Sequence, residues 1–194
     1  MLQRLSDLFG SQRLPSGYGP GATLEQVRRN LAGLSFEALD GARGRFSVPG
    51  AALSFEVVER THSELLMHLV LTDFVLRVPS PGGAPARIEV RHSGALTRTG
   101  LLCKQRQGDT DELAALQATL LEDQALRVAL MPLDFKRLSI ERDSDGWQVS
   151  LEHMAASEVV NRVPSFRRYI RLNDEQRDGL IATFMALQRI LRTC

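Results

Sequence analysis

Four side chains carry functional groups suited to acid–base catalysis: His92, His153, Asp73 and Asp134. A neutral imidazole can take a proton from water near pH 7, and a neighbouring carboxylate can hold the imidazole in position, as in a hydrolase. Both histidines fall on inward-facing positions of expected strands, and Asp73 lies in the most apolar segment. The sequence favours structural roles, with hydrogen-bonded histidines and Asp73 paired with an arginine. A catalytic pair is the alternative.

A second group of side chains is suited to binding anions: Arg162, Arg167, Arg168, Tyr169 and Arg171. Guanidinium groups bind carboxylates and phosphates through paired hydrogen bonds, and an aromatic ring adds a stacking surface. The cluster predicts either a site for a small anionic ligand or partner, or a network of structural ion pairs. Nucleic acid is not expected, because 24 basic residues are balanced by 23 acidic residues, for a net charge of +1.

A glycine-rich loop containing Gly19 and Gly21 precedes a predicted helix that starts at Thr23. Backbone N–H groups at a helix N-terminus can bind an anion. The loop lacks the glycine spacing of nucleotide-binding motifs, and no Lys-Ser or Lys-Thr pair follows it. A structural connector is therefore favoured over a phosphate site.

The chain carries no motif for a metal, a cofactor or a covalent nucleophile. Its four histidines have no metal-ligand spacing, its two cysteines, Cys103 and Cys194, form no CxxC, and there is no GxSxG. We therefore expect no metal or cofactor, and a non-enzymatic protein is favoured over an enzyme.

Length and composition are those of an ordinary globular protein, with 194 residues, of which 43% are hydrophobic and 24% charged. We expect one domain over residues 23–194, preceded by a short helix and a Gly/Pro-rich connector over residues 1–22. No signal peptide or apolar span is recognisable, and two isolated cysteines suit a reducing compartment. The sequence thus predicts a cytoplasmic protein.

The hydrophobic pattern alternates between periods of two and of about 3.6 residues. Period two predicts strands near residues 53–58, 65–78, 87–91, 95–103, 133–142 and 147–153, with a two-residue turn at Ser93–Gly94. Helical spacing predicts helices over residues 2–9, 23–34, 111–121 and 173–191, with Thr23 and Asn173 as N-caps. This order predicts an α+β fold: a twisted antiparallel sheet with amphipathic helices on one face, including a long C-terminal helix.

Three stretches resemble a family of uncharacterised proteobacterial proteins of the pseudomonad type, a domain of unknown function: Met131–Lys136, Ser157–Val160 and Pro164–Leu172. The resemblance extends over most of the chain from the glycine-rich loop onward. It implies a bacterial protein and carries no activity or site residues with it.

Two functions remain open. The favoured one is non-enzymatic binding of a small anionic or amphipathic ligand, or of a protein partner. Its site would be an apolar cleft between the sheet and the C-terminal helix, where five residues line the cleft or simply fill the core: Phe55, Leu69, Leu71, Trp147 and Phe184. The alternative is a hydrolase with a His–carboxylate pair. The sequence leaves the oligomeric state open.

Overall fold

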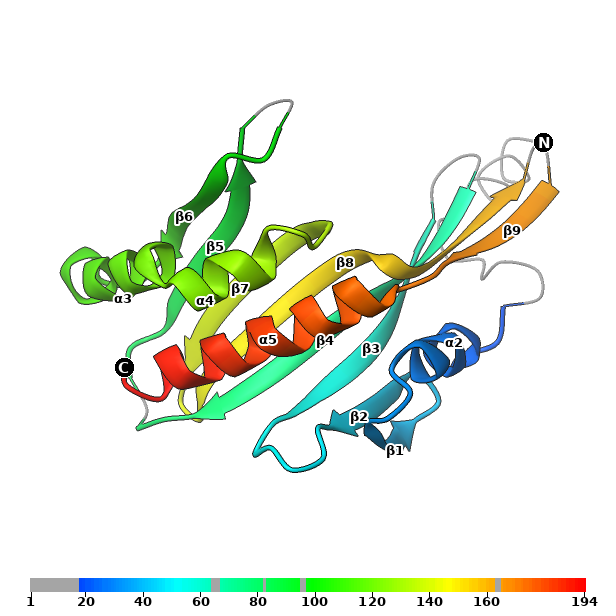
Figure 1. Cartoon of the computed structure of the whole chain (residues 1–194), viewed down its shortest axis with the longest axis horizontal. Helices are drawn as coiled ribbons and strands as arrows, with labels where there is room; N and C mark the ends of the chain where they lie inside the picture. The colour runs from blue at the N-terminus through cyan, green and yellow to red at the C-terminus, as the bar shows by residue number, and fades with distance from the viewer. Residues whose placement is uncertain (1–17, 64–66, 82, 95–96, 163–164) are drawn as a thin grey trace, which may run out of the picture.

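A single antiparallel sheet dominates the computed structural model, which describes residues 18–63, 67–81, 83–94, 97–162 and 165–194. The strands are β1 (Ser35–Asp40), β2 (Arg43–Ser47), β3 (Ser54–Ser63), β4 (Met67–Pro79), β5 (Ala86–Ser93), β6 (Gly100–Gln107), β7 (Phe135–Asp143), β8 (Gly146–Arg162) and β9 (Ser165–Ile170). Their spatial order is β1-β2-β3-β4-β8-β7-β5-β6, and β9 also pairs with β8. The long strands β4 and β8 form the centre of the sheet (Figure 1).

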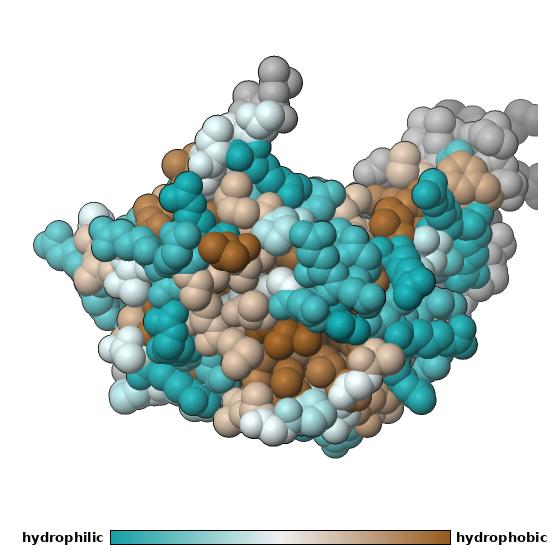
Figure 2. Space-filling model, in the orientation of Figure 1, coloured by the Kyte–Doolittle hydropathy of each residue, from teal (hydrophilic) through white to brown (hydrophobic). Residues whose placement is uncertain are grey.

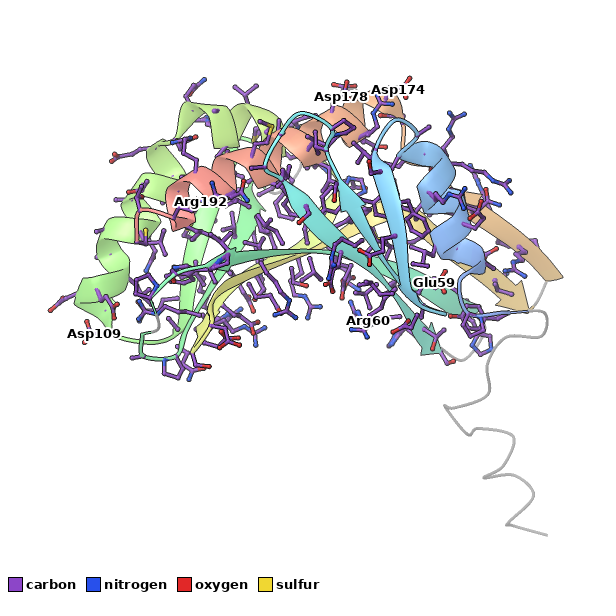
Figure 3. The ribbon with its side chains drawn as sticks, turned by 90° about the horizontal axis from the view of Figure 1, so that it is seen from below. Glu59, Arg60, Asp109, Asp174, Asp178 and Arg192 are labelled. Carbon is purple, nitrogen blue, oxygen red and sulfur yellow. The ribbon has the colours of Figure 1, made fainter. Side chains whose placement is uncertain are left out.

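The helices lie on one side of this sheet and leave the other side uncovered (Figure 3). They are α2 (Ala22–Asn30), α3 (Thr110–Glu122), α4 (Gln124–Leu130) and α5 (Asp174–Leu191). Helix α5 runs along the central strands, and α4 packs beside it (Figure 1). The predicted α+β fold, with helices on one face and a long C-terminal helix, is confirmed. We call the sheet surface beneath the helices the helix side and the other surface the open face.

The hydrophobic core fills the space between the sheet and the helices. Alternate residues of each central strand point into it, as the period-two pattern requires. Phe74 of β4 and Phe184 of α5 are fully buried, and the rings of Phe55 and Phe184 lie 5.2 Å apart between centroids. Burial of one such side chain stabilises the fold by about 1.5–3 kcal/mol.

The five residues expected at an apolar cleft are divided between the two sides of the sheet. Phe55, Trp147 and Phe184 are buried in the core. Leu69 and Leu71 have the opposite parity to the core residue Phe74 on β4, so they face the open side. The alternation of side chains along a strand separates them.

A bulge in β8 lies between the part that pairs with β7 and the part that pairs with β9. Ala156 has a φ of 67° there, and the hydroxyl of Thr72 donates to its carbonyl over 2.6 Å. An extra residue at a bulge reverses the alternation that follows it. Glu158 therefore points to the helix side, where it contacts α2.

Several element boundaries differ from the sequence prediction. Strands β1, β2 and β9 were not predicted, because their charged residues, serines and glycine hide the period of two. The turn expected at Ser93–Gly94 is longer, since β6 begins only at Gly100. The expected helix over residues 2–9 lies outside the described residues. Asn173 caps α5 in a capping box with Gln176, as predicted.

The helix side has a mixed surface, on which apolar atoms gather beside α5 (Figure 2). A shallow cavity of about 270 Å³ lies there between α5 and the β2–β3 connection, and includes the half-exposed Met185. Within the described residues, no helix is both long and apolar enough to cross a membrane.

Candidate functional site

Three carboxylates lie almost buried on the open face: Asp73 of β4, Glu152 of β8 and Glu89 of β5. Strand pairing places Asp73 directly opposite Glu152, since the two are register partners. Each belongs to a strand whose alternate residues fill the core, so the fold itself holds these carboxylates against the sheet. Carboxylates in such positions must be paired or neutralised.

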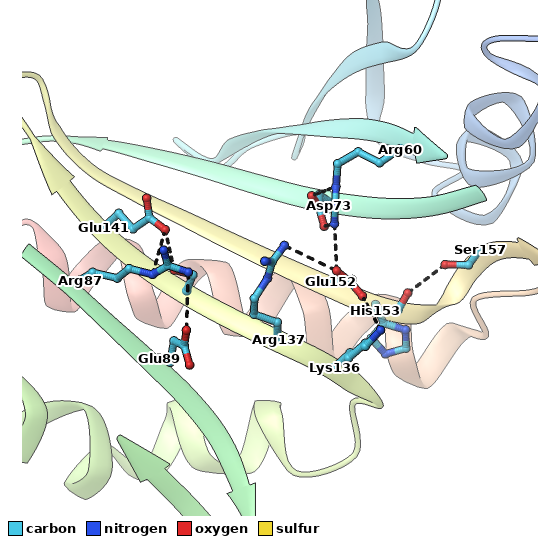
Figure 4. Close-up of polar contacts among 11 residues, drawn as sticks. Arg60, Asp73, Arg87, Glu89, Lys136, Arg137, Glu141, Glu152, His153 and Ser157 are labelled. Carbon is cyan, nitrogen blue, oxygen red and sulfur yellow. Dashed lines mark hydrogen bonds and ion pairs between the residues drawn. The ribbon is translucent and has the colours of Figure 1, made fainter. Parts of the chain in front are cut away.

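Arg60 of β3 connects the first two carboxylates. Its Nε and Nη2 donate to both oxygens of Asp73, and Nη2 also donates to Glu152 over 2.8 Å (Figure 4). Arg137 and Lys136 approach Glu152 at 3.5 and 3.8 Å. The hydrogen bonds that Arg60 donates to Asp73 are the main reason that the pKa of Arg60 is raised.

Glu89, like Asp73 and Glu152, is surrounded by cationic side chains. Arg106 and Arg91 donate to its Oε2 over 2.7 and 2.8 Å, and Arg87 lies 3.5 Å from its Oε1. Arg87 also pairs with the more exposed Glu141 at 3.4 Å (Figure 4). The pKa of Glu89 is lowered, chiefly by the hydrogen bond from Arg106 and then by that from Arg91, against the effect of burial.

The negative and positive charges on this face lie at different depths, with the carboxylates below and the cations above. The side chains of Asp73, Glu89 and Glu152 are 7–10% exposed, whereas the cations above them are 34–66% exposed. We call these ten residues the open-face charge layer: Arg60, Arg87, Arg91, Arg106, Lys136, Arg137, Asp73, Glu89, Glu141 and Glu152. A molecule approaching the sheet meets guanidinium and ammonium groups first, because arginine and lysine side chains are longer than the carboxylates beneath them.

His153 has no access to solvent and no carboxylate on its ring. Its Nε2 lies 3.1 Å from the backbone nitrogen of Asp134, and its Nδ1 lies 3.0 Å from that of Ala155. Both neighbours are backbone N–H groups, and a neutral imidazole accepts through only one ring nitrogen, so one of them donates to the ring and the other is in contact only. Burial lowers the pKa of His153 to about 4, with the hydrogen bond from Ala155 acting in the opposite direction. The residue lies in the middle of β8, not at the end of a strand as the sequence predicted.

His92 lies in the same region, beside Phe135, whose ring centroid is 4.3 Å from that of the imidazole. Phe135 is in turn the register partner of His153. The Nε2 of His92 lies 3.1 Å from the carbonyl oxygen of Leu130, which can only accept, so this nitrogen carries a hydrogen. Burial lowers the pKa of His92. Asp134, for its part, is paired with Arg98 at 2.8 Å.

These contacts do not form the geometry of a His–carboxylate pair. Among the described residues, neither His92 nor His153 hydrogen-bonds a carboxylate, and Asp73 is held by Arg60. Each of these groups has a hydrogen-bond or ion-pair partner within the chain.

The arginine cluster does not converge on one site, because strand alternation divides it. Arg167 faces the helix side, where its Nε and Nη2 donate to the two oxygens of Glu158, and Arg168 points the other way. The hydroxyl of Tyr169 donates to the Asn30 side chain over 2.9 Å, and burial raises its pKa. Arg171 is exposed, and the side chain of Arg162 lies outside the described part of the structure.

The start of α2, expected as a possible anion site, already holds a carboxylate of the chain. Glu59 of β3 accepts hydrogen bonds from the backbone of Gly21 over 2.9 Å, from the backbone of Leu24, and from the hydroxyl of Tyr18 over 2.9 Å. The N-cap is therefore Gly21, with a φ of 91°, and not Thr23. The connector interpretation of Gly19 and Gly21 agrees with this geometry, because Glu59 occupies the place that a phosphate would need.

Sequence reasoning missed the open-face charge layer almost completely. The alternation of Arg87, Glu89 and Arg91 with apolar residues was visible as an amphipathic strand. A surplus of cations on one face of several such strands was the available signal. The pairings themselves depend on register, since Arg60 and Glu152 are 92 residues apart.

No other reactive group stands out in the described residues. They contain no group of three or more histidine, cysteine, aspartate or glutamate residues able to hold a metal ion. Cys103 and Cys194 are free thiols. Burial raises the pKa of Cys103 to about 11, so its nucleophilic thiolate form is suppressed at neutral pH.

Fold and site together define an α+β protein with one sheet face covered by helices and one charged face that no helix of the described residues covers. The family described as "Protein of unknown function (DUF3156)" matches residues 29–191, and the chain belongs to this family. The resemblance to a domain of unknown function is thereby confirmed. No curated protein and no solved structure matches the chain.

Proposed function

We propose that this chain is a non-enzymatic interaction protein whose open-face charge layer binds an acidic segment of a partner protein. The observation that carries the proposal is that three carboxylates, Asp73, Glu89 and Glu152, are 7–10% exposed and lie beneath cations that are 34–66% exposed. The layer has six cations and four carboxylates, so its outer surface is positive.

The surroundings of the layer add to this positive charge. Arg77 is the register partner of Gln148, and Lys104 is the register partner of Glu89, so both cations lie on the open face. Both are exposed. Neither forms an ion pair within the described residues. Electrostatic attraction by such a surface speeds the approach of an oppositely charged partner and selects against basic ones.

A protein partner is favoured over nucleic acid by the side chains on the strands that carry the layer. Sheets that bind single-stranded nucleic acid place aromatic rings beneath the bases. Among the described residues, the open-face positions of β5, β7 and β8 that carry the layer are charged, serine or glutamine. An acidic peptide needs only donors and positive charge, which the guanidinium groups supply.

The proposal is tested with a fluorescein-labelled octaglutamate peptide, whose binding is followed by anisotropy at several salt concentrations. Arg91→Gln with Arg137→Gln removes two cations and leaves two cations on each of Glu89 and Glu152. We expect about tenfold weaker binding, since each exposed charge pair contributes ~0.2–1 kcal/mol. The affinity of the unchanged protein should fall as salt rises.

The matched control is Arg29→Gln with Arg192→Gln, which removes the same charge from exposed positions at and beyond the ends of helices on the helix side. This control should bind the peptide as the unchanged protein does. Equal losses in the two double variants would show attraction by net charge alone and reject the proposal. Tighter binding of an oligothymidylate than of the peptide would reject it in favour of nucleic acid.

A further inference from the structure

A second cavity lies at one end of the helix side, away from the open-face charge layer. It has a volume of about 230 Å³ and is formed by α3, the β7–β8 hairpin and the residues after α5. Its lining residues are Glu112, Leu113, Ala115, Leu116, Arg142, Trp147, Thr193 and Cys194. The volume lies just below the range of about 300–1,000 Å³ that is typical of ligand pockets.

Arg142 supplies this cavity with a nearly buried cation. Its side chain is 9% exposed, its Nε donates to the carbonyl of Ala84 over 2.9 Å, and its Nη1 donates to Glu112 over 2.5 Å. Its Nη2 has no acceptor among the described residues. A guanidinium group has five N–H donors, so those on Nη2 remain available to an acceptor in the cavity. An acceptor from outside the chain would satisfy them.

Trp147 forms a second wall and carries another unsatisfied donor. The residue is 3% exposed, and the guanidinium carbon of Arg142 lies 5.1 Å from its ring centroid. Its buried indole N–H has no acceptor in the described part of the chain. Buried polar groups are nearly always hydrogen-bonded in proteins, so this buried indole donor beside the cavity requires an explanation.

The opposite wall is apolar. Leu113 and Leu116 face the core from α3 and are 1% and 4% exposed, and Ala115 lies between them at the rim. The cavity thus combines a buried cation with a hydrophobic surface. A ligand that fits both has one acceptor group and a small apolar body.

We infer that this cavity is a binding site for a small organic acid, with its carboxylate on Arg142 and its apolar ring or short chain against Leu113 and Leu116. A monoanion is favoured over a phosphate, because Glu112 already neutralises part of the Arg142 charge at 2.5 Å. The cavity is also too small for a drug-sized ligand. This site is independent of the proposed peptide surface.

The test uses the fluorescence of Trp147, which is the single tryptophan of the chain and therefore reports on this cavity alone. Sodium benzoate is titrated into the full chain, and its heat of binding is measured by calorimetry on the same samples. Benzyl alcohol is the neutral analogue of the same size. We expect a saturable signal with benzoate and at least tenfold weaker binding of benzyl alcohol.

Ala115→Leu fills the rim of the cavity and should abolish the benzoate signal. Its matched control is Ala114→Leu, the same change on the next residue of α3, which is exposed and does not line the cavity. Arg142→Lys keeps the charge but loses the guanidinium geometry, and should weaken benzoate binding about tenfold. None of these three variants should alter binding of the octaglutamate peptide.

Three results would overturn the inference. These are the absence of both heat and fluorescence change with benzoate, equal binding of benzyl alcohol, or an Ala114→Leu variant that loses binding as completely as Ala115→Leu. A loss of benzoate binding in the Arg91→Gln, Arg137→Gln double variant would place the acid on the open face instead.

Discussion

At the residue scale, Glu59 occupies the position that an external anion would take at the start of α2. Its buried carboxylate accepts two backbone hydrogen bonds and one from Tyr18. It also raises the pKa of Tyr18 to about 12, after burial as the larger cause. A carboxylate suits this place because of the partial positive charge of the helix N-terminus.

Replacing Glu59 by alanine should therefore destabilise the protein by about 1–3 kcal/mol, since three donors lose their acceptor. Urea unfolding measures this. The control is Glu56→Ala on the same strand. The Glu56 side chain pairs with the half-exposed Arg45 on the open face, so this substitution should lower the unfolding free energy by less than about 1 kcal/mol. Equal losses for the two variants would contradict the capping role of Glu59.

His153 makes the stability depend on pH. Burial lowers its pKa from 6.5 to about 4, so between these values the unfolded chain binds a proton that the folded chain does not. The free energy of unfolding should therefore fall as the pH decreases from 6.5 to 4, by up to about 3 kcal/mol. The lowered pKa of His92 acts in the same direction.

Urea unfolding at half-unit steps between pH 4 and pH 7 tests this dependence. His153→Gln keeps an acceptor oxygen for one backbone N–H and cannot gain a proton, so its unfolding free energy should change less over this range. An unchanged slope in the variant would show that other groups set the acid sensitivity.

At the element scale, the β7–β8 hairpin depends on Gly146. Its φ of 128° favours glycine, and a Cβ there would lie 2.4 Å from the Val78 carbonyl oxygen and 2.6 Å from the Ser80 nitrogen. Gly146→Ala should lower the unfolding free energy by about 1–3 kcal/mol. Gly19→Ala is the control, because its Cβ would meet nothing within 4 Å. A neutral Gly146→Ala would mean that the hairpin can relax around the new methyl group.

The same hairpin shows what the sequence predicts well. Trp147, Val149 and Leu151 alternate with polar residues, and local alternation suffices to define a strand and its inward face. Strand β9 was not predicted, because its inward positions hold Arg167 and Tyr169, which are satisfied by Glu158 and by Asn30 of α2. Those partners come from elsewhere in the chain, so no local pattern reveals them.

At the scale of the whole molecule, the candidate site exists only because the sheet brings distant segments together. Arg60 and Asp73 are 13 residues apart, but Arg60 and Glu152 are 92 residues apart. The polar alternation of single strands was predictable. The register that places a cation over each carboxylate was not, because a shift by one residue would exchange the two faces of a strand.

The central carboxylate of the layer should affect stability and binding in opposite directions. Glu152→Gln removes the negative charge shared by Arg60, Arg137 and Lys136, while Arg60 keeps Asp73. We expect a loss of about 1–2 kcal/mol in urea unfolding, because charged hydrogen bonds to a buried group are lost. The layer becomes more positive, so the octaglutamate peptide should bind several-fold more tightly at low salt. A less stable variant that binds the peptide more weakly would mean that Glu152 positions the cations for binding. Unchanged affinity would mean that the peptide binds elsewhere on the molecule.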